Sequence, residues 1–331
     1  MPKLWQYLGF SQDHPHGKLG LEIETESSKL YNYVPTLNEF WQTQADGSLR
    51  QNGVEYVFRT PYSPEDQNFE DALRVFAEQV KIGKFIQSTY SSVHVHLNML
   101  DKDLTKVMNF ICLYFLAEET LAEYCGNDRN GNLFCLKSTN AELIPRTAKE
   151  IAEAIEEGNG VSYIKQLNNG LLKYSGLNLV PLRTFGSLEV RLHQGCTDVN
   201  LIRRWVNILM CLYNAVDRFA DPVEIVNSFH NRPRQFLTDL FGTFSAYLNF
   251  VDIEEKTKNG LWYVTSVAAA VDNWKTFGNK KATDSPRRTI KKPGNRDHLM
   301  TYYQMIEQAT TDLNARINAR HALRNIVIED F

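Results

Sequence analysis

The chain has 331 residues, of which 43% are hydrophobic, 11% aromatic and 23% charged. This composition is typical of a folded globular protein and excludes a disordered or fibrous chain. The length allows a large core in one elaborated domain or in two. With 36 basic and 39 acidic residues, the formal net charge of -3 creates no global field that would attract nucleic acid or an anionic membrane.

Polar residues interrupt the segments that could direct the chain to a membrane. Trp5, Gln6 and Tyr7 lie where a signal peptide needs a continuous apolar stretch. The most apolar run, residues 107–121, contains two glutamates and is too short to span a bilayer.

The five cysteines never form a CxxC pair, as expected of reduced structural thiols. The sequence therefore predicts a cytoplasmic protein without a membrane partner.

Strands and helices alternate in the first part of the chain. Residues 18–25 alternate leucine and isoleucine with glycine and glutamate, the period-two pattern of a strand with one polar face, and residues 53–59 alternate similarly. Residues 64–83 carry apolar side chains at three- and four-residue steps and end in a glycine, which predicts a helix. Residues 91–99 return to period two with two histidines on the polar side, and the apolar residues 101–124 predict a long helix.

A helix and a fourth polar-faced strand follow in the middle of the chain. Thr147 and Glu150 form a candidate capping box for a helix that ends at Gly158. Residues 187–193 alternate leucine and valine with glutamate, arginine and histidine. His193, two residues after an arginine on the same predicted face, is expected to be a structural residue rather than a catalyst.

Strands scattered among helices without a steady βαβ rhythm favour an α+β fold with a largely antiparallel sheet covered by helices. We expect a first domain over residues 1–220, which closes with a helix at 198–219, and a mostly helical extension packed on it over residues 221–331. The extension includes a helix at 298–327 and a basic loop at 279–296. Such charge runs are usually exposed, so a solvated loop is favoured over a flexible lid or a contact with a polyanion.

The polar faces of the four predicted strands carry carboxylate, imidazole and guanidinium groups, whereas surface strands usually carry Thr, Lys, Ser and Gln. Carboxylates and imidazoles together suit Mg²⁺ or Mn²⁺. A single ExE or HxH pair more often belongs to a solvated or salt-bridged face, so only the joint occurrence favours a metal site. The candidate ligands are Glu22, Glu24, Glu55, His94, His96 and Glu189. Because the chain has no Walker sequence, nucleotide phosphates would be held by metal ions, and Arg191 could neutralise a phosphoryl group in transfer.

Four short motifs occur in a specific order along the chain. They are GLEIE at 20–24, DGS at 46–48 with GVE at 53–55, SVHVHLN at 92–98 and EVR at 189–191. In this order they resemble the amidoligase family, a branch of the glutamine synthetase and glutamate-cysteine ligase fold, over residues 18–205. The resemblance implies a curved antiparallel sheet, one face of which binds ATP with two or three divalent ions and forms an acyl phosphate that an amine attacks.

The resemblance also implies roles for individual residues. Glu22, Glu24, Glu55, His94 and Glu189 would be metal ligands, and Glu55, Glu189 and Arg191 would take part in catalysis, with Arg191 steadying the transferred phosphoryl group. His96, Lys173 and Arg183 would contact nucleotide phosphates, and Asn178 would touch the bound substrate. The chain offers fewer acidic ligands between the first strand and the histidine strand than the glutamine synthetase pattern, so the third metal site is not matched.

The sequence thus predicts an ATP- and Mg²⁺- or Mn²⁺-dependent ligase that joins a small-molecule or peptide carboxylate to an amine. Two alternatives stay open. A metal-dependent hydrolase or phosphotransferase on the same fold would turn over without ATP or yield a phosphorylated product without an amide. A non-catalytic binding or assembly module would bind metal weakly. The sequence determines neither the two substrates nor the oligomeric state.

Overall fold

The computed structural model describes residues 1–27, 39–45, 49–50, 53–86, 88–126, 135–167 and 172–279. All of them belong to the first of the two units into which the chain divides, Met1–Ala282. The DGS motif, the predicted basic loop apart from Asn279, and the predicted helix at 298–327 lie outside the described residues.

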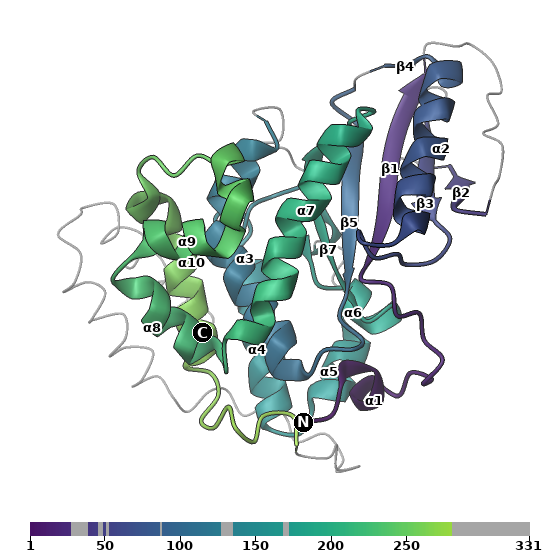
Figure 1. The fold of residues 1–331 in the computed structure, drawn as a ribbon. Coiled ribbons are helices and arrows are strands. Elements are labelled where there is room, and N and C mark those ends of the chain that lie inside the picture. The colour runs from purple at the N-terminus through teal and green to yellow at the C-terminus, as the bar shows by residue number, and fades with distance from the viewer. Residues whose placement is uncertain are drawn as a thin grey trace, which may run out of the picture. The chain divides into compact units, whose positions relative to one another are not determined.

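Seven strands of this unit form one antiparallel sheet (Figure 1). Six of them follow the order β2-β3-β1-β5-β7-β6, and β4 pairs with the end of β1. The strands are β1 Leu19–Ser27, β2 Trp41–Gln44, β3 Val54–Phe58, β4 Phe85–Ile86, β5 Ser92–Asn98, β6 Leu177–Asn178 and β7 Ser187–Gln194. The four predicted strands are β1, β3, β5 and β7. The other three have only two to four residues, too few for a recognisable alternation.

Helices complete an α+β fold, as the sequence predicts. They are α1 Leu4–Leu8, α2 Gln67–Gly83, α3 Leu104–Tyr124, α4 Leu143–Glu156, α5 Gly160–Gln166, α6 Pro181–Thr184, α7 Val199–Ala215, α8 Pro222–His230, α9 Pro233–Phe241 and α10 Ile253–Ala268. Asp103 caps α3 by accepting a hydrogen bond from the Lys106 amide at 3.0 Å, and Asp198 caps α7 in the same manner through the Asn200 amide at 2.8 Å.

The start of α4 differs from the sequence prediction. The helix begins at Leu143, so Thr147 and Glu150 lie inside it and do not form a capping box. Pro145 falls in the first helical turn, where its missing amide hydrogen has no partner to lose. Thr147 is buried, and the Glu150 carboxylate accepts a hydrogen bond from the Tyr163 hydroxyl of α5.

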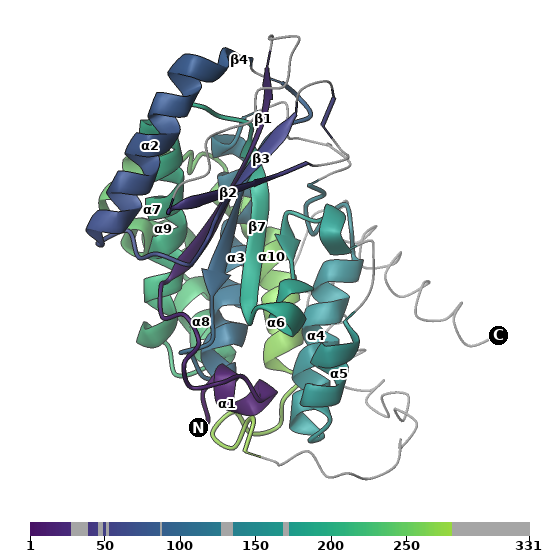
Figure 2. The same ribbon diagram turned by 90° about the vertical axis from the view of Figure 1, so that its right-hand side faces the viewer.

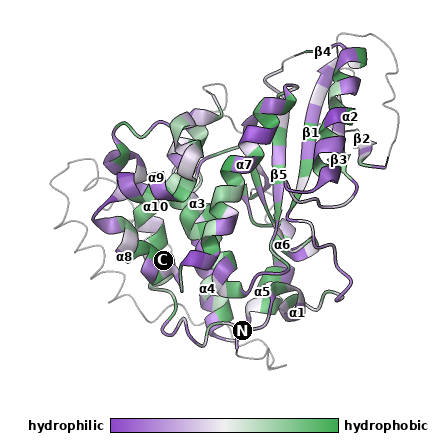
Figure 3. Ribbon diagram, viewed as in Figure 1, coloured by the Kyte–Doolittle hydropathy of each residue, from purple (hydrophilic) through white to green (hydrophobic). Residues whose placement is uncertain are grey.

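The sheet packs its apolar face against α2, α3 and α7. Trp41 of β2 donates a hydrogen bond from Nε1 to the Ala72 carbonyl of α2 at 2.8 Å, and its ring lies 5.7 Å from the ring of Phe76. Figure 2 places α2 and α7 on one side of the strands and α4 and α5 on the other. Figure 3 shows the alternation behind this packing as hydrophilic and hydrophobic bands along β1 and β5.

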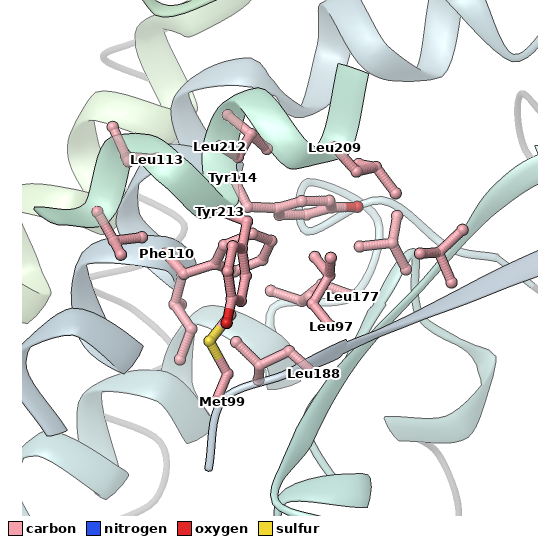
Figure 4. Close-up of a cluster of buried hydrophobic side chains, with 14 of the residues drawn as sticks. Leu97, Met99, Phe110, Leu113, Tyr114, Leu177, Leu188, Leu209, Leu212 and Tyr213 are labelled. Carbon is pink, nitrogen blue, oxygen red and sulfur yellow. The ribbon is translucent and has the colours of Figure 1, made fainter. Parts of the chain in front are cut away.

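The centre of the core lies where the end of β5 and the start of β7 pack against α3 and α7. Figure 4 shows the strand residues Leu97 and Leu188 in one buried cluster with Phe110 of α3 and Leu209 of α7. Tyr213 of α7 is bound to the strand end, because its hydroxyl donates to the Asn98 carbonyl at 3.0 Å. This packing leaves the opposite face of the sheet to polar side chains.

The helices after residue 220 belong to the same unit as the sheet. Helix α10 lies directly along α3, where a β-carbon added to Gly260 would stand 2.1 Å from the Phe115 carbonyl oxygen. The approach therefore requires glycine at this position. The predicted domain boundary at residue 220 falls inside Met1–Ala282, just before α8.

Two expectations about the whole chain can be compared with the structure. Among the described residues, no helix combines the length and the hydropathy needed to cross a membrane. All five cysteines are described, and none forms a disulfide in the structure.

Candidate metal centre

The pairing of the strands gathers the predicted polar residues on one face of the sheet. Glu22 of β1 lies opposite His94 of β5. On its other side β1 pairs with β3, and Glu24 lies opposite Glu55 there. His96 of β5 lies opposite Glu189 of β7. Directly opposed residues have β-carbons about 4.5–5.5 Å apart, so strands distant in sequence deliver their side chains to one cluster.

His94 is the most central member of this cluster. Its Nδ1 lies 3.2 Å from Glu22 Oε2 and 3.5 Å from Glu189 Oε1, while its Nε2 lies 2.6 Å from the Ser92 hydroxyl. The side chain is almost fully buried. His94 of β5 thus connects carboxylates of β1 and β7, and Ser92, which in turn donates to Glu24 Oε2 at 2.5 Å, links it to a second carboxylate of β1.

Neutral donors hold two of the buried carboxylates. Glu24 accepts the hydrogen bond from Ser92, and Glu55 accepts one from the Gln44 amide of β2 at 2.5 Å. Neither neutral donor offsets the carboxylate's charge, although His94 Nε2 comes within 3.9 Å of Glu24 Oε1. Burying a carboxylate without a compensating positive charge is costly.

In the part of the chain that the structure describes, Arg191 is the one guanidinium that contacts the cluster. Its Nη1 lies 2.5 Å from Glu189 Oε1 and 3.4 Å from His94 Nδ1. The second oxygen of Glu189 accepts a hydrogen bond from Asn178 Nδ2 at 2.7 Å. Asn178 of β6 lies directly opposite Glu189 in the sheet, so the structure brings this predicted site residue into the cluster.

A β-bulge in β7 separates Arg191 from His193. Val190 pairs with Val95 but His193 pairs with Val93, so three residues of β7 span two of β5. The extra residue turns His193 to the apolar face, where its ring lies 5.4 Å from Trp205 and 6.2 Å from Tyr124. The prediction that His193 shares the face of Arg191 is therefore wrong, whereas its structural role is consistent with this packing.

The charges of the cluster shift the pKa values of its members. Burial alone would raise the pKa of Glu22, but the imidazoles of His96 and His94 outweigh it and hold this pKa well below its usual value. Burial is likewise outweighed at Glu189 by His96 and Arg191, which lower its pKa. Burial would lower the pKa of His96, yet the carboxylates of Glu189 and Glu22 raise it to about 9. The metal-free cluster thus attracts positive charge.

Two overlapping sets of ligand atoms could each hold a metal ion. One is Glu22, His96 and Glu189, and the other is Glu22, Glu55 and His94, with all atoms of a set within 4.8 Å of one another. Glu22 belongs to both sets, as a carboxylate shared between two cations would. Glu24 belongs to neither, and His96, predicted to contact nucleotide phosphate, lies among the candidate metal ligands.

The cluster is accessible from one side. The side chains of Glu22, His96 and Arg191 retain 20%, 15% and 19% exposure, against 2–5% for His94, Glu24 and Glu189. A ligand would therefore approach the first three residues. The ring of Phe185, 65% exposed, lies edge-on 6.3 Å from the His96 ring and adds an apolar surface beside this opening.

The structure does not bring Lys173 and Arg183 into the cluster. Lys173 is exposed within the 3₁₀ turn Leu172–Tyr174, and its Nζ lies 4.9 Å from the centroid of the Tyr174 ring. Arg183 lies half-buried in α6. Within the described ranges, neither side chain makes an ion pair or hydrogen bond with a cluster residue.

Sequence reasoning assigned no role to two residues that support the cluster. Ser92, which contacts Glu24 and His94, has the same strand parity as His94, so period-two spacing could have identified it. Gln44 carried no such signal, because β2 is only four residues long.

No protein-family model matches the chain, and no curated protein is similar to it in sequence. What the chain does must therefore be inferred from the geometry of its own residues.

Proposed function

We propose that the chain is a divalent-metal- and ATP-dependent carboxylate-amine ligase of the amidoligase kind, with the active site on the polar face of the sheet. One observation carries the proposal. Among the described residues, four carboxylates, two imidazoles and one arginine from four strands form a largely buried cluster. Such an excess of buried negative charge is stable and useful where cations are bound.

The ligand chemistry supports Mg²⁺ or Mn²⁺. Carboxylate oxygens predominate, and hard divalent ions complete their octahedral shell with waters and substrate phosphates. Glu22, Glu55 and His94 would hold one ion, and Glu22, His96 and Glu189 a second. When bound, these ions would neutralise the β- and γ-phosphate oxygens of ATP. Glu24 would support the first set through Ser92 and His94.

Arg191 has the position required of a group that stabilises a phosphoryl group in transfer. Glu189 orients the guanidinium, which remains partly exposed at the opening of the cluster. The substrate carboxylate would attack the γ-phosphorus of ATP and release ADP, and the amine nitrogen would then attack the acyl carbon and release phosphate. Glu55 is the proposed acceptor of the proton that the amine loses, because His96 and Arg191 lower the pKa of Glu189 and leave it the role of orienting Arg191.

A metal-dependent hydrolase or phosphotransferase is the second candidate function. The observation that favours it is the position of Lys173 and Arg183, whose side chains do not contact the cluster, so that Arg191 is its sole permanent cation among the described residues. This candidate needs fewer phosphate contacts. It predicts hydrolysis without ATP, or a phosphorylated product without an amide.

Binding of Mg²⁺ with a non-hydrolysable ATP analogue tests the ligase proposal by titration calorimetry. We expect binding that requires the metal and weakens at least about tenfold in Glu22→Gln and Arg191→Ala, because each removes a charge that the metal-nucleotide complex contacts. Glu78→Gln and Arg74→Ala, exposed residues of α2, are the matched controls and should bind as the wild type does.

Product analysis then separates the two candidate functions. ADP release that depends on both a carboxylate and an amine supports the ligase. Absence of metal-dependent nucleotide binding in the wild type, or turnover of an ester or phosphoester without ATP, contradicts it.

A further inference from the structure

A second group of metal-ligating side chains lies outside the cluster described above and shares no residue with it. His14 and His16 come from the segment between α1 and β1, and Asp101 lies just before α3. His14 Nε2 is 3.4 Å from Asp101 Oδ1, and His16 Nδ1 is 2.9 Å from Asp101 Oδ2. One ligand atom from each residue lies within 4.8 Å of the other two.

The hydrogen bonding of His14 directs a lone pair at the carboxylate. Its Nδ1 lies 3.0 Å from the Ser11 carbonyl oxygen, which can only accept, so Nδ1 carries the hydrogen. In the neutral ring, Nε2 is then a hydrogen-bond acceptor, and it faces Asp101 Oδ1, which is also an acceptor. This atom is buried and has no hydrogen-bond partner among the described residues, and the side chain is only 4% exposed. Buried polar atoms without partners are rare and call for an explanation.

A cation between the two acceptors would explain this arrangement. Histidines that bind metals commonly donate their other ring hydrogen to a backbone carbonyl, as His14 does to Ser11. Both imidazoles have a nitrogen atom near the Asp101 carboxylate, and their ring centroids lie 4.6 Å apart. Lys3 Nζ lies 3.5 Å from Asp101 Oδ1 on a half-exposed side chain, and a divalent ion bound at this carboxylate would displace it.

The segment that carries the histidines is held in place by the end of β5. Asn98 donates hydrogen bonds from Nδ2 to the Pro15 and Gly17 carbonyls, each at 2.8 Å, and accepts one from the Leu100 amide at 3.1 Å. At Gly17 an added β-carbon would stand 2.0 Å from the Pro61 carbonyl oxygen, so the backbone passes close to its neighbour. Both histidines are thus positioned before any ligand binds.

We propose that His14, His16 and Asp101 bind a divalent transition-metal ion of the Zn²⁺ class. Two imidazoles and one carboxylate are the ligands that zinc prefers, with water in a fourth position. The oxygen-rich cluster on the sheet suits harder ions, so the two sites differ in the metal they select. The bound ion would connect the segment before β1 to the start of α3, and this site does not depend on the proposed ligase activity.

Titration of the full chain with Co²⁺ in saturating Mg²⁺ tests the site, because Co²⁺ reports on its ligands through visible absorption. We expect the wild type and Glu22→Gln to bind Co²⁺ alike. His14→Ala, His16→Ala and Asp101→Asn should bind it at least about tenfold more weakly, because loss of a direct ligand costs no less than loss of a supporting residue. His230→Ala, an exposed histidine of α8, is the matched control.

Three outcomes would overturn the proposal: no Co²⁺ binding in the wild type, unchanged affinity in His16→Ala and Asp101→Asn, or loss of binding in Glu22→Gln instead. In these cases the group is not a metal site, and a protonated histidine forms an ion pair with the Asp101 carboxylate. If buried His14 cannot be replaced without unfolding, His16 remains testable because its side chain is 68% exposed, and Asn has the shape of Asp101. Zn²⁺ should also raise the Tm of the wild type but not of His16→Ala.

Discussion

His96 illustrates how single residues in the cluster depend on their surroundings. The Nε2 atom of His96 lies 3.1 Å from Glu22 Oε1 and 3.9 Å from Glu189 Oε1, and both carboxylates favour the protonated imidazole. In the metal-free protein, this imidazolium supplies part of the positive charge that a bound cation would otherwise provide. Metal binding at this position should therefore displace a proton.

The raised pKa of His96 predicts a pH dependence of stability in the metal-free protein. The pKa is about 9 in the folded state and ordinarily 6.5, so the stabilising contribution is full below about pH 6.5 and is lost as the pH rises towards 9. We expect a loss of up to roughly 3 kcal/mol over this range. Urea unfolding with a chelator between pH 6 and 9.5 measures it.

The control for this prediction is a variant without the ionisable ring. His96→Gln should flatten the pH dependence, while His230→Gln on the surface of α8 should leave it unchanged. An equal decline in wild type and His96→Gln would show that other groups cause it.

Among the elements, the strands followed their sequence pattern more closely than the helix starts did. The polar faces of β1, β3, β5 and β7 could be predicted because side chains alternate in any strand, whatever its partners. The start of α4 could not, since the capping-box spacing of Thr147 and Glu150 also occurs inside a helix and Pro145 is tolerated in the first turn. The face of His193 could not either, because a bulge is visible only when two strands are paired.

Helix α10 offers a test at the scale of two packed elements. Gly260→Ala should destabilise the protein by about 1–3 kcal/mol, since the new methyl group would overlap the backbone of α3. In an exposed helix the same change would stabilise by up to about 1 kcal/mol, so the sign itself is diagnostic. Asn259→Ala, at the exposed neighbouring position, is the control and should be neutral or slightly stabilising. Thermal and urea unfolding measure both, and a more stable Gly260→Ala protein would contradict the close packing.

At the scale of the molecule, the helices after residue 220 contribute to the core of the sheet-containing unit. Ile253, Val264 and Val267 of α10 are fully buried. At about 1.5–3 kcal/mol each, they stabilise the fold by roughly 5–9 kcal/mol, comparable with the whole stability of many domains. The predicted division at residue 220 would remove all three.

Truncation tests whether that division marks an independent domain. We expect residues 1–282 to fold and residues 1–220 to be largely unfolded or aggregated, because α3 would lose its contact with α10. Circular dichroism and size-exclusion chromatography distinguish these states. A cooperative, monodisperse 1–220 fragment would support the boundary at 220 instead.

The sequence by itself determined which strands have a polar face and which side chains stand on it, because alternation and residue type are local properties. The tertiary structure decided which of these side chains meet. It placed Glu22 between the two histidines of β5, left Glu24 outside both ligand sets, and brought Asp101 to His14 and His16 from 85 residues away in the case of His16. The contacts of Glu22 follow from strand order and register, and that of Asp101 from the approach of two segments outside the strands; both arise only when segments distant in the chain come together.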